Sequence, residues 1–216
     1  MKKIMFNDKY GLTKAVLDGR KTQTRRVCNI QPPYKNSEIA FPTEFILKEE
    51  PEKHPLYGSY CWVNMDNKDE HTEWIVPKYK VGEIVAVAQS YKDCGGFMDN
   101  GVPRWDYISQ IVGNKNGGWN NKMFVKPELM PHQIRITKVR IQKLQDISDE
   151  DCLAEGIEYI ANARAYYVSH NTKTGKRYWL GSTPRKAYAA LIDKVSGKGT
   201  WDSNPYVWVY EFKLIK

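Results

Sequence analysis

The stretch that most constrains the fold runs from Ile134 to Leu144. Apolar and polar residues alternate along it, which is typical of a half-buried β-strand. The apolar positions do not keep one strict phase, and we therefore expect a β-bulge near Lys138. A second strand is predicted over residues 206–212, where β-branched and aromatic residues follow one another.

Three helices are predicted from their start and end signals, at about residues 8–18, 149–155 and 184–196. Glycine follows each of them, at Gly19, Gly156 and Gly197, and glycine enters the left-handed cap conformation at no steric cost. Asn7 or Asp8 is expected to cap the first helix. Ser148 is expected to cap the second, with Asp151 in the position of the capping-box glutamate, and Thr183 with Pro184 opens the third.

The residues after the first helix form a basic run, Gly19-Arg20-Lys21-Thr22-Gln23-Thr24-Arg25-Arg26. It contains four positive charges and two threonine hydroxyls but no acidic residue. Like charges repel unless an anion lies among them, so the run favours a site for phosphate, carboxylate or an oxyanion. The alternative is a solvated surface whose cations complement the end of the helix.

Composition narrows the functional classes. The chain has 216 residues, 41% of them hydrophobic, and a net charge of +8, which suggests a polyanionic partner such as RNA. No segment approaches the length of a membrane span, and no N-terminal signal segment is evident. The four cysteines are widely spaced and form no CxxC pair, so we expect free thiols, no metal site and a cytoplasmic location.

The remaining segments are less regular. We predict a short strand at residues 4–6, a β-hairpin with arms at 57–65 and 73–76, and a buried strand at 84–88. Residues 27–56 are proline-rich and predict irregular chain with at most short strands. Residues 93–122 read as a long loop, and residues 158–181 show little pattern.

Four pieces of the chain together resemble ASCH domains, a branch of the PUA-like superfamily. They are the basic run, Lys126-Pro127 with Met130-Pro131 and Arg135-Ile136, the segment 144–157, and Trp201 with Asn204-Pro205-Tyr206-Val207-Trp208-Val209. The last piece is similar to the larger, phage- and prophage-type members. The resemblance implies an α+β fold: a single domain over 1–216 with a small, strongly bent β-barrel, peripheral helices, a basic cleft, and insertions at about 31–75 and 93–122.

The resemblance also implies a function. Members of the family are thought to bind RNA, and some are hydrolases, among them small bacterial amidohydrolases that deacetylate N4-acetylcytidine without a metal or cofactor. Their catalytic lysine, threonine and glutamate correspond here to Lys21, Thr24 and Glu155. The expected partner is RNA or a modified nucleoside, and the candidate residues that bind it are Arg20, Arg25, Arg26, Arg135, Trp201 and Asn204. One departure is Ala88-Gln89, where many larger relatives have Arg-Glu.

The chemistry can be argued from the residues themselves. A threonine hydroxyl is a weak nucleophile and needs a base, and a lysine that is desolvated or set among other cations can act as one. A carboxylate such as Glu155 can pass a proton to a leaving amine. Lys21 and Thr24 share a face only if the chain stays turned beyond Gly19. The alternatives are a non-catalytic RNA-binding module, with Trp201 or Tyr206 stacking a base, and an RNA-cleaving enzyme with Lys21 as the base.

Overall fold

The computed structural model describes residues 1–42, 54–94, 117–168 and 178–215. Its centre is a five-stranded sheet in the order β1-β5-β6-β10-β2. The strands are β1 (Lys2–Ile4), β2 (Gln23–Val27), β5 (Ile84–Val87), β6 (Gln133–Lys143) and β10 (Tyr206–Ile215). β1 pairs with β5 in parallel, and the other neighbours are antiparallel.

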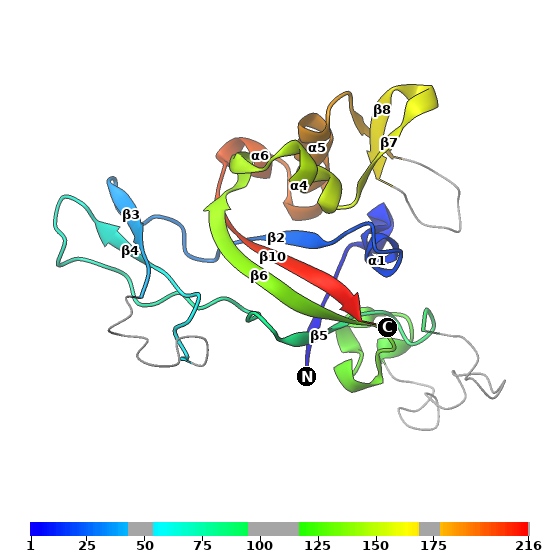
Figure 1. The fold of residues 1–216 in the computed structure, drawn as a ribbon, viewed down its shortest axis with the longest axis horizontal. Helices are drawn as coiled ribbons and strands as arrows, with labels where there is room; N and C mark the ends of the chain where they lie inside the picture. The colour runs from blue at the N-terminus through cyan, green and yellow to red at the C-terminus, as the bar shows by residue number, and fades with distance from the viewer. Residues whose placement is uncertain (43–53, 95–116, 169–177, 216) are drawn as a thin grey trace.

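The two longest strands, β6 and β10, run side by side as a curved ribbon (Figure 1). Their register shifts between Glu211 and Phe212, where Lys138 and Ile136 are the successive partners on β6. This irregularity confirms the bulge that the broken alternation predicts near Lys138. Both strands extend beyond their predicted ends at one side, because the pairing continues to Ile215 and Gln133.

The predicted hairpin at 57–76 is only partly correct. β4 (Cys61–Asn64) pairs as a ladder with β3 (Ser37–Ala40), which comes from the proline-rich segment. The segment after β4 is joined to the first predicted arm by isolated bridges, Tyr60 with Ile75 and Val63 with His71, of which only the first lies between the two predicted arms. Residues 43–53 and 95–116, which belong to the two predicted insertions, lie outside the described residues.

The helices follow the predicted signals except at the first, where the predicted cap at Asn7 or Asp8 is wrong: Asn7 makes no capping hydrogen bond, and Gly11 precedes α1. The first is two elements: a 3-10 turn at Asp8–Tyr10 and α1 (Leu12–Leu17), with Gly11 between them at φ 65°. α4 (Asp149–Ala154) and α5 (Pro184–Ser196) begin at the predicted caps, where the hydroxyls of Ser148 and Thr183 accept backbone N–H bonds. A short α6 (Thr200–Ser203) was not predicted, nor was the small sheet of β7 (Ile157–Ile160), β8 (Ala165–Val168) and β9 (Tyr178–Gly181).

The architecture is therefore α+β, with a core that is mostly sheet. Within the described residues the main sheet stays open, since β1 and β2 are its two edges and do not pair. α4, α5 and α6 gather on one side of β2 (Figure 1), and the core packs between them and the sheet around Tyr188, Leu191 and Val209. In the same described parts of the chain, no helix has the length and apolar character to cross a membrane.

Gly156 allows α4 to lie close to the basic run. Its φ is 96°, and a Cβ there would lie 3.3 Å from the Cβ atoms of both Ala15 and Lys21. We therefore expect Gly156→Ala to combine backbone strain with crowding and to lower the free energy of unfolding by about 2 kcal/mol or more.

The control for this prediction is Gly82→Ala. Gly82 has a similar φ of 81°, but nothing lies within 4 Å of its Cβ position, so only the backbone strain of about 1 kcal/mol applies. Urea unfolding of the two variants measures the difference. Equal losses would mean that the contact between α4 and the basic run relaxes freely.

Candidate functional site

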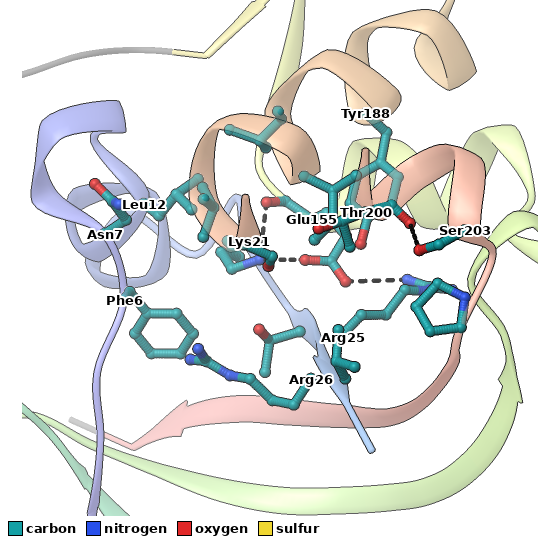
Figure 2. A pocket seen from close by; sticks show the side chains of 17 residues that line it. Phe6, Asn7, Leu12, Lys21, Arg25, Arg26, Glu155, Tyr188, Thr200 and Ser203 are labelled. Atoms are coloured by element: carbon teal, nitrogen blue, oxygen red, sulfur yellow. Dashed lines mark hydrogen bonds and ion pairs between the residues drawn. The ribbon is translucent and has the colours of Figure 1, made fainter. Parts of the chain in front are cut away.

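A pocket of about 360 Å³ lies where α4, α5 and α6 meet the sheet edge at β2 (Figure 2). Its lining combines charged groups from the basic run with apolar groups from α5. The lining residues are Phe6, Asn7, Leu12, Lys21, Thr24, Arg25, Arg26, Val27, Glu155, Tyr188, Leu191, Ile192, Val195, Ser196, Thr200, Ser203 and Pro205. The lysine, threonine and glutamate singled out from the sequence are all among them.

The backbone after α1 explains how Lys21 and Thr24 reach the same pocket. The amides of Arg20 and Lys21 both donate to the carbonyl of Ala15, each at 2.9 Å, which keeps the chain turned beyond Gly19. Thr22 then donates to Ala154 at 2.9 Å and accepts from Phe212 at 2.8 Å. The basic run is thus tied to the end of α4 and to β10, and it extends as β2 only from Gln23 onward.

The Glu155 carboxylate lies between two buried cations (Figure 2). Its Oε2 is 2.5 Å from Nζ of Lys21, and its Oε1 is 3.0 Å from Nη1 of Arg25. Nζ of Lys21 also donates to the backbone carbonyl of Glu155 at 2.9 Å. Only 2% of Lys21 and 4% of Glu155 are exposed, so this pairing takes place almost out of contact with water.

The charge network continues away from the pocket. Nη2 of Arg25 is 2.5 Å from the Asp151 carboxylate, which also binds Arg140 at 2.9 Å. Arg140 in turn pairs with Glu211 on β10. Asp151 therefore does not fold back onto Ser148 as the predicted capping box requires, although the Ser148 hydroxyl does cap the helix.

Burial disfavours the charged form of both cations, but the neighbouring groups compensate for it to different extents. It lowers the pKa of Lys21, and the charge of Glu155 opposes only part of that shift. Burial acts against the charge of Arg25 as well, but Glu155, Tyr188 and Asp151 outweigh it and raise the pKa of that guanidinium. Arg25 is thus a fixed charge, whereas the pKa of Lys21 is lower than that of an exposed lysine.

The protein itself supplies most of the anions that the basic run requires. Arg20 pairs with Asp18 and Glu158, while Lys21 and Arg25 pair as described. Arg26 differs from these three, because among the described residues it has no carboxylate partner. Its Nη2 donates to the carbonyl of Met5, and its guanidinium lies 5.8 Å from the centre of the Phe6 ring. Arg26 is therefore the cation that remains available for an anionic ligand.

Two hydroxyls in the pocket lining are available for hydrogen bonds. The described parts of the structure contain no hydrogen bond from the Thr24 hydroxyl and none from that of Tyr188, which is fully buried. Burial, with a further contribution from Glu155, raises the pKa of Tyr188 well above its ordinary value, so this hydroxyl stays protonated. The sequence indicated Tyr188 only as part of the apolar stripe of α5, because helical periodicity does not show where a side chain's tip ends.

The other predicted binding residues lie outside the pocket lining. Arg135 is exposed on β6, and Arg20 is held by its two carboxylates. Trp201 packs edge-on against Tyr188 at 6.2 Å and beneath Arg185 at 5.2 Å. Asn204 ends α6 at φ 43°, and its side chain accepts the amide of Gln145 at 2.8 Å. In the structure Trp201 has a packing role and Asn204 has a role in a turn.

The cysteines show no sign of nucleophilic activation. All four are buried. Burial raises the pKa of Cys28 to about 11 and that of Cys152 to about 12, which disfavours the reactive thiolate. In the described ranges no three His, Cys, Asp or Glu side chains are grouped so that they could hold a metal ion.

Arg25 is expected to be essential for stability. Its side chain is completely buried, and Arg25→Ala would leave Glu155 and Asp151 without their shared cation. Removing one partner of a buried ion pair costs about 3–5 kcal/mol. Arg20→Ala is the control, since it removes a partly exposed arginine from the same run and should cost about 0–1 kcal/mol. Urea unfolding measures both, and a loss at Arg25 no larger than that at Arg20 would contradict this account.

Comparison with known proteins adds no assignment: the chain matches no protein-family model, no curated protein and no solved structure.

Proposed function

We propose that the protein is a hydrolase that cleaves an amide or ester on a nucleobase, with an acylated cytidine such as N4-acetylcytidine as its substrate. The observation that carries the proposal is the convergence of Lys21, Thr24 and Glu155 on one pocket, with Lys21 and Glu155 in direct contact at 2.5 Å. This set contains a nucleophile, a base and a proton donor, as the cleavage of an amide bond requires.

Thr24 is the nucleophile in the first step. Its oxygen attacks the acyl carbon while its proton passes to the neutral amine of Lys21. Burial, which lowers the pKa of Lys21, favours that neutral form. The direct contact between Nζ and Oε2 lets the Lys21 proton move to Glu155 without an intermediary. Lys21 thus acts as the base for Thr24, and Glu155, once protonated, acts as the acid in the second step.

The second step breaks the bond between the acyl carbon and the amine. Glu155 gives its proton to the departing amine nitrogen, so that the deacylated nucleoside leaves and the acyl group stays on Thr24. A water molecule then attacks the acyl carbon of this ester, its proton passes through the same pair of groups to the departing oxygen of Thr24, and the carboxylic acid is released. Each proton that Lys21 or Glu155 takes up is returned, and neither a metal nor an oxidant enters the balance.

The rest of the lining supports such a substrate. Tyr188 offers a buried O–H donor with no partner in the described structure, which suits the oxygen of the acyl group or of the base. Arg26 offers the cation that no described carboxylate neutralises, and Phe6 and Leu191 add apolar wall. A flat, polar base between an apolar wall and a hydrogen-bond donor fits a pocket of this composition.

The proposal includes membership of the ASCH family, on the sequence motifs that resemble it. The order of the main sheet and the placing of the basic run beside α4 are compatible with a PUA-like, ASCH-type domain, a bent barrel being the finer form of the open α+β sheet described above. The contacts of Glu155 favour catalysis over simple RNA binding, because a carboxylate in the middle of a phosphate site opposes the ligand's charge.

Glu155→Gln tests the catalytic role. Glutamine keeps the shape and much of the hydrogen bonding but cannot give or take a proton. We expect kcat on N4-acetylcytidine to fall on the order of 10²–10⁴-fold, with KM nearly unchanged. The control is Glu158→Gln, which removes a carboxylate of the neighbouring strand that pairs with Arg20 and lies outside the pocket lining.

A loss confined to KM would mean that Glu155 holds the substrate and moves no proton. If the wild-type protein turned over no acylated nucleoside but bound RNA, and Glu155→Gln bound it equally well or better, a non-catalytic RNA-binding module would replace the proposal. Circular dichroism of each variant separates loss of activity from loss of folding.

Tyr188→Phe tests the buried hydroxyl. Because that hydroxyl has no partner in the described structure, its removal should leave the free energy of unfolding unchanged or raise it. If the hydroxyl donates to the substrate, kcat/KM should fall by about tenfold or more, the equivalent of one lost hydrogen bond. Unfolding and kinetic measurements on the same sample check both parts. A variant that is less stable but fully active would show that the hydroxyl has a structural role.

A further inference from the structure

A second pocket, of about 500 Å³, lies beside the first. Its floor is aromatic, formed by Trp208 and Tyr210 of β10 with Tyr79. Both tyrosine hydroxyls are already bonded, Tyr79 to the carbonyl of Lys3 at 2.9 Å and Tyr210 to the amide of Lys78 at 3.1 Å. The floor is therefore fixed by the fold, and only a small part of each ring reaches the pocket, since 7% of Trp208, 3% of Tyr79 and 1% of Tyr210 are exposed.

The rim of this second pocket combines positively charged side chains with apolar ones. Lys3, Arg26 and Lys78 line it, and the lining contains no acidic residue. No salt bridge to a carboxylate is found for any of the three among the described residues: Lys3 donates to backbone carbonyls, and Lys78 lies 5.5 Å from the centre of the Tyr79 ring. Exposed apolar side chains complete the rim, including Val76, which is 44% exposed. Unneutralised cations around an aromatic floor suit a ligand that is both anionic and flat.

The two pockets share a wall. Arg26 and Val27, at the end of β2, line both of them. Arg26 is paired directly with Trp208 across the strands, so its side chain and the indole lie on the same face of the sheet. A ligand that occupied both pockets would pass Arg26 at the boundary, where one phosphate would meet the available guanidinium.

We propose that the second pocket binds the neighbouring nucleotide of a single-stranded RNA whose modified base occupies the first pocket. This inference rests on the proposed function, and it makes a base within an RNA strand, rather than a free nucleoside, the preferred substrate. The phosphate between the two nucleotides lies at Arg26, Lys78 binds the ligand at the far side, and the second base lies against the exposed apolar side chains of the rim, Val27 and Val76.

The test uses two probes on the full chain. Fluorescence anisotropy measures binding of a labelled tricytidylate, and a separate assay measures kcat/KM on free N4-acetylcytidine and on a trinucleotide with N4-acetylcytidine at its centre. The variants are Lys78→Ala, which removes an exposed cation of the rim, and Val76→Glu, which adds an acid there. The matched control is Lys138→Ala, an exposed lysine of β6 outside both linings.

We expect the wild type to prefer the trinucleotide to the nucleoside by about tenfold or more in kcat/KM. Lys78→Ala should weaken tricytidylate binding about fivefold and reduce the salt slope by about 0.7, the value for one phosphate of a single strand. Val76→Glu should weaken it more, Lys138→Ala less than twofold, and none of the three should change turnover of the nucleoside.

The failures can be told apart. Turnover of the nucleoside with no preference for the trinucleotide, or equal effects of Lys78→Ala and Lys138→Ala, would overturn the second pocket and leave the proposed hydrolysis intact. Loss of tricytidylate binding in the two rim variants, without turnover of either substrate by the wild type, would support the second pocket and reject the hydrolysis. Absence of tricytidylate binding by the wild type at low salt would overturn the inference.

Discussion

The pairing of Glu155 with Lys21 and Arg25 is the interaction on which the site depends. A carboxylate this deeply buried is stable only when its charge is matched and its oxygens are bonded, and here one oxygen faces each cation. The need to satisfy this anion brings the end of α4 against the basic run. The neighbouring Thr24 and Tyr188 hydroxyls have no protein partner among the described residues, and both line a pocket where a ligand can provide a hydrogen-bond partner.

Features encoded by neighbouring residues could be predicted from the sequence. The hydroxyl caps of α4 and α5 and the bulge near Lys138 follow from local rules, and the structure confirms each of them. The strands β7 to β9 were missed because each has only four residues and apolar and polar residues do not alternate along them. That Lys21, Thr24 and Glu155 share a pocket came from a resemblance, since 134 positions separate Lys21 from Glu155 and no local signal joins them.

The sequence was least informative about charge balance. Four cations within eight residues predict an electropositive site. Three of them, however, pair with carboxylates, which belong to Asp18, Asp151, Glu155 and Glu158. Those partners lie on other elements, so the count along the run overstates the charge that a ligand encounters. Asp151 illustrates the point: it stands where a capping residue is expected, but two buried or half-buried guanidinium groups attract it more strongly than the helix end does.

The position of Thr22 has a consequence for how the molecule assembles. Its amide is bonded to the end of α4 and its carbonyl to β10, so one residue near the start of the chain joins two elements made much later. On a ribosome that adds about 5–20 residues each second, Lys21 and Arg25 are made several seconds or more before their carboxylate partners Asp151 and Glu155, and longer before the sheet partner β10. Contacts of such long sequence separation also slow refolding. The pocket around Lys21 and Glu155 is therefore among the last parts of the protein to be assembled, and a polycationic nascent segment precedes it.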